Sequence, residues 1–447
     1  MLVKQFVDAP LAHFSYAIVS NGKMALVDPA RNPQPYYKFA EEQEAEIVAV
    51  FETHPHADFI SGHLQIHHET GADIYISEKV GVSYPHKSFD HGDSWQMGDV
   101  KFSCIFTPGH SPDSISIVAE SDNNTALFSG DTLFIGNVGR PDLREKAGNM
   151  KQKREELAAM MYETMQTKYN DLPDDTLVYP AHGAGSLCGK GMSDATSGIL
   201  GHERKYNWAF NTGDKDEFVK ELLSEQPMIP AYFGNSVEVN RKGAEAYAQA
   251  LGAVKRSVAC SELKKDLLVI DVREENDFKH KHIPGSINIM ARNEKDKFET
   301  WLGATVQPDE NFYLVVNSVK DVDEMLDRVS KIGYEANIEA VITLAPNFEE
   351  GSTMDHINLQ HFKEHPASYT IVDIRNVGEV ENKRVFDNAI NIPLHELRGR
   401  VAEIPVEKPI VVHCAGGYRS ATGSSIVANE LGDAEIYDLS FAISEFN

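Results

Sequence analysis

Residues 52–59 read Glu-Thr-His-Pro-His-Ala-Asp-Phe and directly follow the apolar run IVAVF. Three later loops share this plan, in which an apolar run leads into a histidine or an aspartate: TPGH at 107–110, SGDT at 129–132 and PAHG at 180–183. Strand ends of a sheet lie side by side, and ligands of α/β proteins bind beyond the carboxyl ends of strands. Because the pattern recurs at each of these exits, the four loops predict one shared metal site rather than isolated structural histidines.

Apolar runs of strand length surround these loops. They are 14–20, 24–30, 47–52, 72–77, 100–106, 114–120, 125–130 and 176–181. The dipeptide Asn21-Gly22 separates the first two runs, and Asn-Gly between apolar runs predicts a hairpin. Between the last two runs, Leu157, Met160, Met161 and Met165 recur at helical spacing, which predicts core packing rather than a cofactor site. Strands interleaved with helices predict an α/β layered domain.

The second half of the chain contains an internal repeat. LLVIDVREENDFKHKHIPGSINI (267–289) resembles YTIVDIRNVGEVENKRVFDNAINI (369–392), and YLVVNS (313–318) resembles IVVHCA (410–415). Two similar α/β units of about a hundred residues each fit one domain apiece. We therefore expect three domains, at 1–240, 241–349 and 350–447.

Composition argues against several classes of function. The net charge is −26, from 68 acidic and 42 basic residues, and this field repels phosphate, so neither nucleic acid nor an anionic membrane is an expected partner. No run approaches the roughly 20 apolar residues of a membrane span, and we see no secretory signal. Four cysteines in 447 residues do not indicate a disulfide framework. A cytoplasmic location is expected, with Cys104 and Cys260 as packed core thiols.

The donor types leave two metal sites open. His54, His110 and Asp131 would supply two imidazoles and one carboxylate with open positions, which is typical of Fe(II) oxygenases. His54, His56 and His110 would instead form a three-histidine zinc site with one open water position. Spacing alone does not separate these two sets.

The order H-x-H-x-D, then H, D and H, resembles the metallo-β-lactamase superfamily over roughly residues 1–230. That resemblance implies an αββα sandwich. Binuclear members continue the first motif with another histidine, at the position where this chain has Phe59. Because a phenyl ring donates no lone pair, a two-metal hydrolytic mechanism is weakened and one ion is favoured.

Within that superfamily, the domain is similar to persulfide dioxygenases. The resemblance implies an iron ion held by His54, His110 and Asp131. It also implies a set of neighbouring groups that orient ligands or move protons. These neighbours are His56, Asp58 and His182.

Two further groups are candidates for substrate contact. Arg140, in Gly139-Arg140-Pro141-Asp142, also resembles the dioxygenase family. It would either hold an anionic tail of the substrate or form a structural ion pair. Cys188 follows His182 in the Gly-rich run HGAGSLCGK. It would either accept or relay sulfur near the metal, or be a packed thiol.

Cys414 follows the apolar run IVVH and begins the loop Cys-Ala-Gly-Gly-Tyr-Arg before a helix-like stretch. A thiol at a helix N-terminus meets inward N–H groups and the positive end of the helix dipole, which favours a thiolate or a persulfide anion. Gly416 and Gly417 let the backbone approach the sulfur, and Arg419 offers a fork for an oxyanion such as sulfite. The loop resembles the rhodanese loop C-x-x-G-x-R, and Asp373-Ile374-Arg375 matches that family's strand signature.

The middle copy of the repeat departs from this pattern. Ser318 stands where the last copy has Cys414, and its loop lacks the glycines and the arginine. A serine hydroxyl stays mostly protonated at neutral pH and cannot carry a persulfide. This copy is therefore predicted to be a structural or oligomerisation module.

Taken together, the parts resemble bacterial persulfide dioxygenase–rhodanese fusion enzymes. That resemblance implies one Fe(II) per chain, oxidation of a low-molecular-weight thiol persulfide by O2 to sulfite, and sulfur transfer through Cys414 to give thiosulfate in sulfide detoxification. The expected partners are the thiol persulfide, O2 and sulfite, in a homo-oligomer. Two alternatives stay open, a glyoxalase II-like thioester hydrolase and a non-catalytic sulfur-binding scaffold. No motif selects glutathione, coenzyme A or bacillithiol as the thiol carrier.

Overall fold

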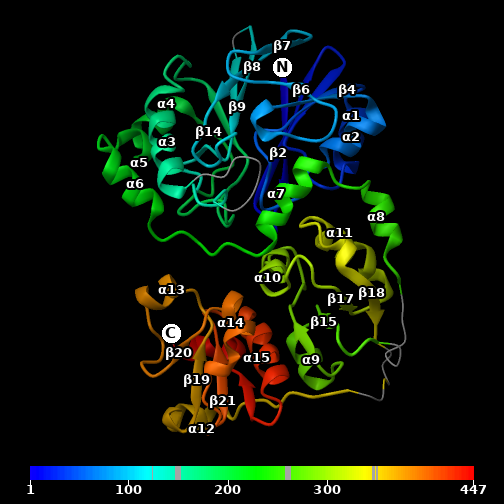
Figure 1. Cartoon of the computed structure of the whole chain (residues 1–447), viewed down its shortest axis with the longest axis vertical. Coiled ribbons are helices and arrows are strands. Elements are labelled where there is room, and N and C mark those ends of the chain that lie inside the picture. Colours follow the sequence, from blue (N-terminus) through cyan, green and yellow to red (C-terminus); the bar gives the residue numbers. More distant parts are fainter. Residues whose placement is uncertain (123, 146–152, 257–262, 345–347, 349–350, 447) are drawn as a thin grey trace. The chain divides into compact units, whose positions relative to one another are not determined.

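The computed structural model describes residues 1–122, 124–145, 153–256, 263–344, 348 and 351–446. The chain forms two compact units (Figure 1): unit 1 is residues 1–249 with 330–333, and unit 2 is residues 250–329 with 334–447. The expected domain boundary at residues 349 and 350 and the expected core thiol Cys260 lie outside the described residues. Within the described part, none of the helices combines the length and apolar character that crossing a bilayer requires.

Unit 1 is built on two six-stranded sheets. The first has the order β1-β2-β3-β4-β5-β6, with bounds Leu2–Asp8, His13–Ser20, Lys23–Val27, Glu46–Phe51, Asp73–Ile76 and Lys87–Ser88. The second has the order β14-β13-β10-β9-β8-β7, with bounds Gly198–Ile199, Leu177–Pro180, Asn124–Gly130, Ile115–Ser121, Val100–Phe106 and Ser94–Met97. A small ribbon pairs β11 (Leu133–Phe134) with β12 (Asn137–Val138). Every apolar run predicted to be a strand contributes one.

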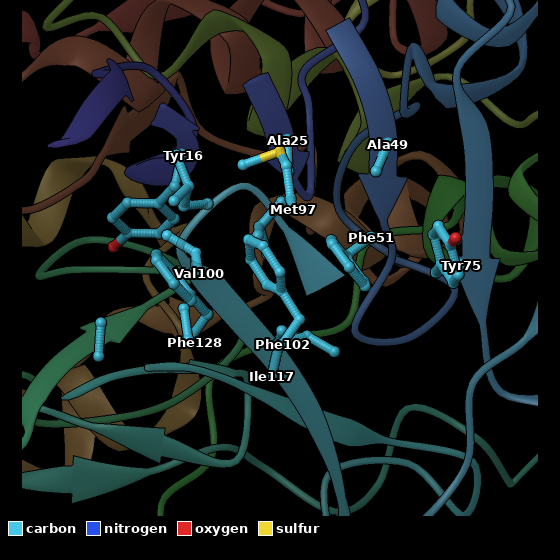
Figure 2. Packing of buried hydrophobic residues seen from close by; sticks show 14 of the residues in the cluster. Tyr16, Ala25, Ala49, Phe51, Tyr75, Met97, Val100, Phe102, Ile117 and Phe128 are labelled. Atoms are coloured by element: carbon cyan, nitrogen blue, oxygen red, sulfur yellow. The ribbon is translucent and has the colours of Figure 1, made fainter. Parts of the chain in front are cut away.

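The main core of unit 1 lies between the two sheets (Figure 2). Phe51 of the first sheet stacks on Phe102 of the second, with ring centroids 4.9 Å apart, and Tyr16 meets Phe128 edge to face at 5.1 Å. Cys104 is buried in the same cluster, as predicted for a core thiol. Burial of these large rings is the main force that holds the two sheets together.

Helices cover the outer face of each sheet. The helices of unit 1 are α1 (Gln34–Glu42), α2 (His63–Thr70), α3 (Arg154–Thr167), α4 (Leu200–Tyr206), α5 (Trp208–Asn211), α6 (Lys215–Leu223) and α7 (Tyr232–Lys242), and α8 (Tyr247–Ala253) begins in unit 1 and ends in unit 2. Tyr36 of α1 and Ile66 of α2 pack behind the first sheet, whereas Met161 and Met165 of α3 and Phe218 of α6 pack behind the second. The methionine stripe is therefore core packing, and the expected αββα sandwich is confirmed.

The chain reverses direction at the predicted hairpin between β2 and β3. Asn21 and Gly22 have φ angles of 51° and 71°, as a two-residue type I′ turn requires. The apolar run 24–30 was expected to be a strand throughout, but β3 ends at Val27 because Asp28 has a φ of 49°. Aspartate tolerates this left-handed backbone better than most residues, and the turn places a buried carboxylate at the end of β3.

Unit 2 contains two four-stranded parallel sheets with the same topology, one for each copy of the repeat. The middle copy has the order β16-β15-β17-β18, with bounds Ser286–Asn288, Leu268–Asp271, Phe312–Val316 and Ile338–Thr343. The last copy has β20-β19-β21-β22, with bounds Ile390–Asn391, Thr370–Asp373, Ile410–His413 and Ile436–Asp438. The helices are α9 (Glu275–His280), α10 (Phe298–Thr305), α11 (Val322–Ser330), α12 (Leu359–Glu364), α13 (Val377–Asn382), α14 (Leu394–Arg400) and α15 (Tyr418–Glu430).

The two copies are joined along the edge strand β16 of the middle sheet. The backbone N–H of Asn288 donates to Ser425 Oγ at 3.0 Å, and the hydroxyl of Thr422 donates to the carbonyl of Asn288 at 2.7 Å. Both hydroxyls belong to α15, so this helix satisfies the edge of the neighbouring sheet. The helix that follows Cys414 is thereby anchored on the middle copy.

Candidate functional site

The four loops predicted to carry ligands follow β4, β8, β10 and β13, and their side chains meet in unit 1. Gly130, the last residue of β10, has a φ of 55°, and a Cβ there would lie 2.6 Å from the hydroxyl oxygen of Thr53. Only glycine combines this backbone with so close an approach. The loop after β10 can therefore place Asp131 next to His54.

His54, His110 and Asp131 form one group of donors whose ligating atoms lie within 4.8 Å of one another. Asp131 Oδ2 is 3.8 Å from His54 Nε2 and 3.5 Å from His110 Nε2. All three side chains are buried, and among the described residues neither carboxylate oxygen of Asp131 has a hydrogen-bond partner. A buried carboxylate whose oxygens lack hydrogen bonds is costly, and a cation between the three groups would relieve that cost. The residues present therefore fit a metal ion.

Thr53 orients the ring of His54. The hydroxyl of Thr53 donates to Asp28 Oδ2 at 2.8 Å and lies 3.0 Å from His54 Nδ1. Because its single proton goes to Asp28, the oxygen of Thr53 accepts the proton of His54 Nδ1. The lone pair of His54 is then on Nε2, the atom that faces Asp131, as a metal ligand needs.

The protonation of the two histidines in this group also suits a metal. Burial, together with the neighbouring imidazoles, lowers the pKa of His54 well below its usual value. Burial lowers the pKa of His110 as well, although Asp131 opposes the effect. Both rings are neutral at pH 7, and the neutral imidazole is the form that binds metal.

His56 belongs to a second cluster. Its Nε2 lies 3.1 Å from Asp28 Oδ1 and 3.5 Å from Glu52 Oε2. Burial lowers the pKa of His56, but the two carboxylates outweigh burial and raise it well above its usual value. The contacts of its Nε2 with Asp28 and Glu52 agree with the implied place of His56 outside the ligand set. Its Nδ1, on which the three-histidine alternative depends, is buried without a hydrogen-bond partner among the described residues.

His182 bridges two carboxylates on the other side of the site. Its Nε2 is 3.3 Å from Asp58 Oδ2 and 3.6 Å from Asp131 Oδ1, and its Nδ1 is 3.2 Å from the carbonyl oxygen of Ala12. Burial lowers the pKa of His182, but Asp58 and Asp131 outweigh burial and raise it to about 9. A cationic His182 agrees with the expectation that it and Asp58 lie beside the ligands rather than among them.

Phe59 occupies the position where binuclear relatives have a histidine. Its ring centroid lies 3.8 Å from that of His13 and 4.3 Å from that of His56, and the side chain is 1% exposed. The phenyl ring is thus packed among imidazoles without adding a donor. This arrangement supports the prediction of a single ion.

Cys188 lies at the candidate metal site rather than in the general core. Its sulfur forms a group with donors of Asp58 and His182, all within 4.8 Å of one another. Burial and the nearby carboxylates of Asp58 and Asp131 raise the pKa of Cys188 well above its usual value, so the thiol stays protonated in this environment. The sulfur-relay role is compatible with this position and stays a prediction.

Arg140 links neighbouring segments of unit 1 through hydrogen bonds. Its Nε and Nη2 donate to the carboxylate of Asp142 at 2.7 and 2.8 Å, and its Nη1 donates to the carbonyl of Leu187 at 3.1 Å. Its backbone N–H donates to the carbonyl of Cys188 at 2.9 Å. The guanidinium is buried and engaged by these groups. Of the two alternatives, the geometry favours the structural ion pair.

The Arg140→Met variant is expected to lose about 3 kcal/mol of unfolding free energy, because removing one partner leaves the charge of Asp142 uncompensated in a largely buried place. Urea unfolding measures this loss, and the double variant with Asp142→Leu should recover part of it. If Arg140 instead held a substrate tail, stability would be unchanged and KM would rise for a persulfide that bears a carboxylate.

The loop of Cys414 connects β21 to α15 in unit 2 (Figure 1). The N–H of Gly417 points to Cys414 Sγ at 3.1 Å. Gly417 has a φ of 98°, and a Cβ there would lie 2.6 Å from the backbone nitrogen of Phe441, so glycine is required. Gly416 is exposed with open space around it, so no close approach depends on its being glycine. The loop therefore directs a backbone N–H at the sulfur of Cys414, and the negative sulfur and the substrate contacts of the two glycines stay predictions.

Arg419 does not present a free fork. Its Nη1 and Nη2 donate to Glu379 Oε2 and Oε1 at 2.7 and 2.6 Å, so the bidentate position expected for an oxyanion is taken by a carboxylate. The pKa of Arg419 is lowered by burial, but Glu379 and, to a smaller extent, Cys414 outweigh burial and raise it. The charge of Arg419 therefore acts on the thiol of Cys414 as well as on Glu379.

The matching loop of the middle copy has different chemistry. Ser318 Oγ donates to Asp321 Oδ2 at 3.1 Å, and Val319 is 76% exposed. A hydroxyl tied to a carboxylate cannot replace the thiol of Cys414, in agreement with the prediction of a copy without this chemistry.

Several residues of the site were not identified from the sequence. Asp28 follows the apolar run MALV, so the rule of polar groups at strand exits could have found it. His13 begins a strand, and only the antiparallel pairing of β2 with β3 brings that start to the end where β3 and β4 finish. Glu379 lies within a helix of the repeat and carried no signal of its contact with Arg419.

Comparison with known proteins supports this architecture. The metallo-beta-lactamase superfamily matches residues 8–182, and the rhodanese-like domain matches residues 258–336 and 358–447. A crystal structure titled metallo-beta-lactamase from Staphylococcus aureus subsp. aureus COL is 30% identical, covers 77% of this chain and 99% of that chain, and has a TM-score of 0.69. The structure of ETHE1 from Myxococcus xanthus is 25% identical over 54% of this chain and 98% of that chain, with a TM-score of 0.47.

A curated relative is a probable hydroxyacylglutathione hydrolase from Schizosaccharomyces pombe, 32% identical over 163 residues. The match spans 35% of this chain and 58% of that protein's length. The match therefore covers only part of either protein. Together with the matched ranges and the two sheets of unit 1, these similarities show that the chain belongs to the metallo-beta-lactamase superfamily and continues into rhodanese-like domains.

Proposed function

We propose that unit 1 is a non-heme Fe(II) persulfide dioxygenase and that the last copy of unit 2 is a rhodanese, as in bacterial fusion enzymes of the CstB type. The observation that carries the proposal is the convergence of two neutral imidazoles and one carboxylate, from His54, His110 and Asp131, while His56 is held by other carboxylates. Fe(II) bound there would supply the redox chemistry that O2 requires.

The groups beside the ligands are suited to handle protons. The reaction RSSH + O2 + H2O → RSH + HSO3⁻ + H⁺ releases a proton among side chains that are almost fully buried. Burial raises the pKa of Asp58, but the neighbouring His182 outweighs burial and lowers it to about 2, so Asp58 stays a carboxylate. His182 holds its proton between Asp58 and Asp131. His182 can therefore release this proton and take one up again, and the net charge of the Asp58–His182 pair then changes by one.

The rhodanese step uses the product of the first reaction. A persulfide transfers its outer sulfur to the thiol of Cys414 and leaves as RSH. Sulfite then attacks that outer sulfur, the S–S bond breaks with its electron pair left on Cys414 Sγ, and thiosulfate forms with no oxidant consumed. The N–H of Gly417 and the charge of Arg419 both face the sulfur that gains this negative charge.

A thioester hydrolase is the second candidate, because curated relatives of this chain are named hydroxyacylglutathione hydrolase. Hydrolysis of this kind uses a metal-activated water and consumes no O2. An O2 electrode separates the two reactions on one iron-loaded preparation, offered first glutathione persulfide and then a glutathione thioester. We expect O2 uptake with the persulfide and no faster cleavage of the thioester than with denatured protein. Thioester cleavage without O2 uptake would overturn the proposal.

The Phe59→His variant is expected to bind a second ion. The new imidazole would join Asp58 and His182 and complete the second position of the binuclear relatives. After zinc loading and desalting, elemental analysis should find one ion per chain in the unmodified protein and close to two in the variant. Phe59→Leu opens the same packing without a lone pair, so it should stay at one. Equal zinc contents in Phe59→His and Phe59→Leu would show that Phe59 does not set the number of ions.

A further inference from the structure

Arg419 is held from two sides within unit 2. One side is the carboxylate of Glu379, which accepts from both Nη atoms. The other is the indole of Trp301, whose ring centroid lies 5.4 Å from the guanidinium carbon. A planar cation between a carboxylate and an aromatic face loses most of its rotational freedom. The side chain that faces Cys414 is thus fixed by residues from both copies of the repeat.

Glu379 is itself fixed by the start of α13. Its Oε2 accepts the backbone N–H of Asn376 at 3.0 Å, in a capping box that closes the first turn of the helix. The carboxylate therefore cannot follow Arg419 if the guanidinium moves. Its burial raises the pKa of Glu379, but Arg419 outweighs burial and lowers it, so the pair stays charged.

Trp301 comes from α10 of the middle copy, which is anchored against the last copy. Arg398 of α14 donates to both carboxylate oxygens of Glu310 at 2.7 and 2.9 Å, and to the carbonyl of Thr305 at 2.8 Å. Next to Arg419 in the chain, the hydroxyl of Tyr418 donates to the carbonyl of Met290 at 2.6 Å. These hydrogen bonds from Arg398 and Tyr418 therefore hold the middle copy, and with it the indole of Trp301, against the last copy.

We propose that Trp301 and Glu379 position Arg419 against the sulfur of Cys414, so that the middle copy, which has Ser318 in place of a thiol, completes the sulfur-transfer site of its neighbour. The inference rests on the proposed sulfur transfer at Cys414. When sulfite attacks the outer sulfur, the bond to Cys414 Sγ breaks and its electron pair stays on Sγ. A positive charge already fixed there stabilises this change without reorganisation. Trp301 is a positioning residue because it acts through Arg419.

The test compares Trp301→Leu with Trp301→Phe in the full chain, with thiosulfate formation from persulfide and sulfite as the readout. Loss of the aromatic face should lower kcat about tenfold, the size of a partly desolvated cation–π contact, and leave KM for sulfite within about twofold. Phenylalanine should restore most of kcat. Phe298→Leu is the matched control, because Phe298 lies on the same helix and contacts Arg328 rather than Arg419; it should lower stability and leave kcat unchanged.

A double-variant cycle separates positioning from general structure. In the Arg419→Ala background, Trp301→Leu should cause no further fall in kcat. An unchanged kcat in Trp301→Leu, or the same tenfold fall with Arg419 absent, would overturn the inference while sulfur transfer by the unmodified protein still stands. If the unmodified protein transfers no sulfur, the proposed function and this inference fall together.

Discussion

The His110→Ala variant is expected to lose persulfide-dependent O2 uptake by more than about a hundredfold. Changes to the groups that merely orient metal ligands already cost about 10–100-fold, and His110 Nε2 is one of the three donors that converge on the candidate site. Sulfur transfer at Cys414 should be retained, because that loop lies in the other unit. An O2 electrode and a thiosulfate–cyanide sulfur-transfer assay on one preparation measure both effects.

His68 provides the control for this loss. It is an exposed histidine of α2 outside the groups of possible metal ligands in the described part of the chain. His68→Ala should consume O2 like the unmodified protein. Uptake by His110→Ala at the same rate would exclude the assignment of His110 as a ligand.

The Cys414→Ser variant is expected to keep O2 uptake and to release sulfite in place of thiosulfate. The serine hydroxyl stays protonated and cannot accept the outer sulfur of a persulfide, so sulfite made by unit 1 has no partner at this loop. Chromatography of derivatised sulfur anions, timed against O2 consumption, reports the ratio of the two products. We expect enzymatic thiosulfate to fall to the rate seen without protein.

Ser318 offers the matched control, since it occupies the corresponding loop of the middle copy. Ser318→Ala should leave the product ratio unchanged. A Cys414→Ser variant that still forms thiosulfate at the unmodified rate would make the last copy a binding scaffold and not a sulfurtransferase.

The ligand loops and the repeat could be predicted because both are encoded locally. Each ligand needs only an apolar run followed by a histidine or an aspartate, and strands that end together bring such groups together whatever the details of packing. The same holds for the Cys414 loop, where a strand, two glycines and a helix determine that a backbone N–H points at the sulfur. The departure at Ser318 could be recognised because the last copy of the repeat has Cys414 at the matching position.

The partners of these groups could not be predicted, because they depend on contacts between distant segments. Nothing in the spacing of the first motif shows that Asp28 and Glu52 hold His56, or that the start of β2 brings His13 beside Phe59. Arginine side chains are the clearest example. The sequence does not tell whether a guanidinium is free or paired, and only the fold shows that Glu379 accepts a hydrogen bond from Arg419.

Protein that is purified and loaded with Fe(II) under argon allows its iron content to be compared with its O2-dependent turnover. We predict one iron per chain, activity proportional to iron content, and one O2 consumed for each sulfite formed when Cys414 is replaced. Active protein that holds two zinc ions per chain, or that processes persulfide equally well without air, would contradict the assignment of His54, His110 and Asp131 as an oxygenase site.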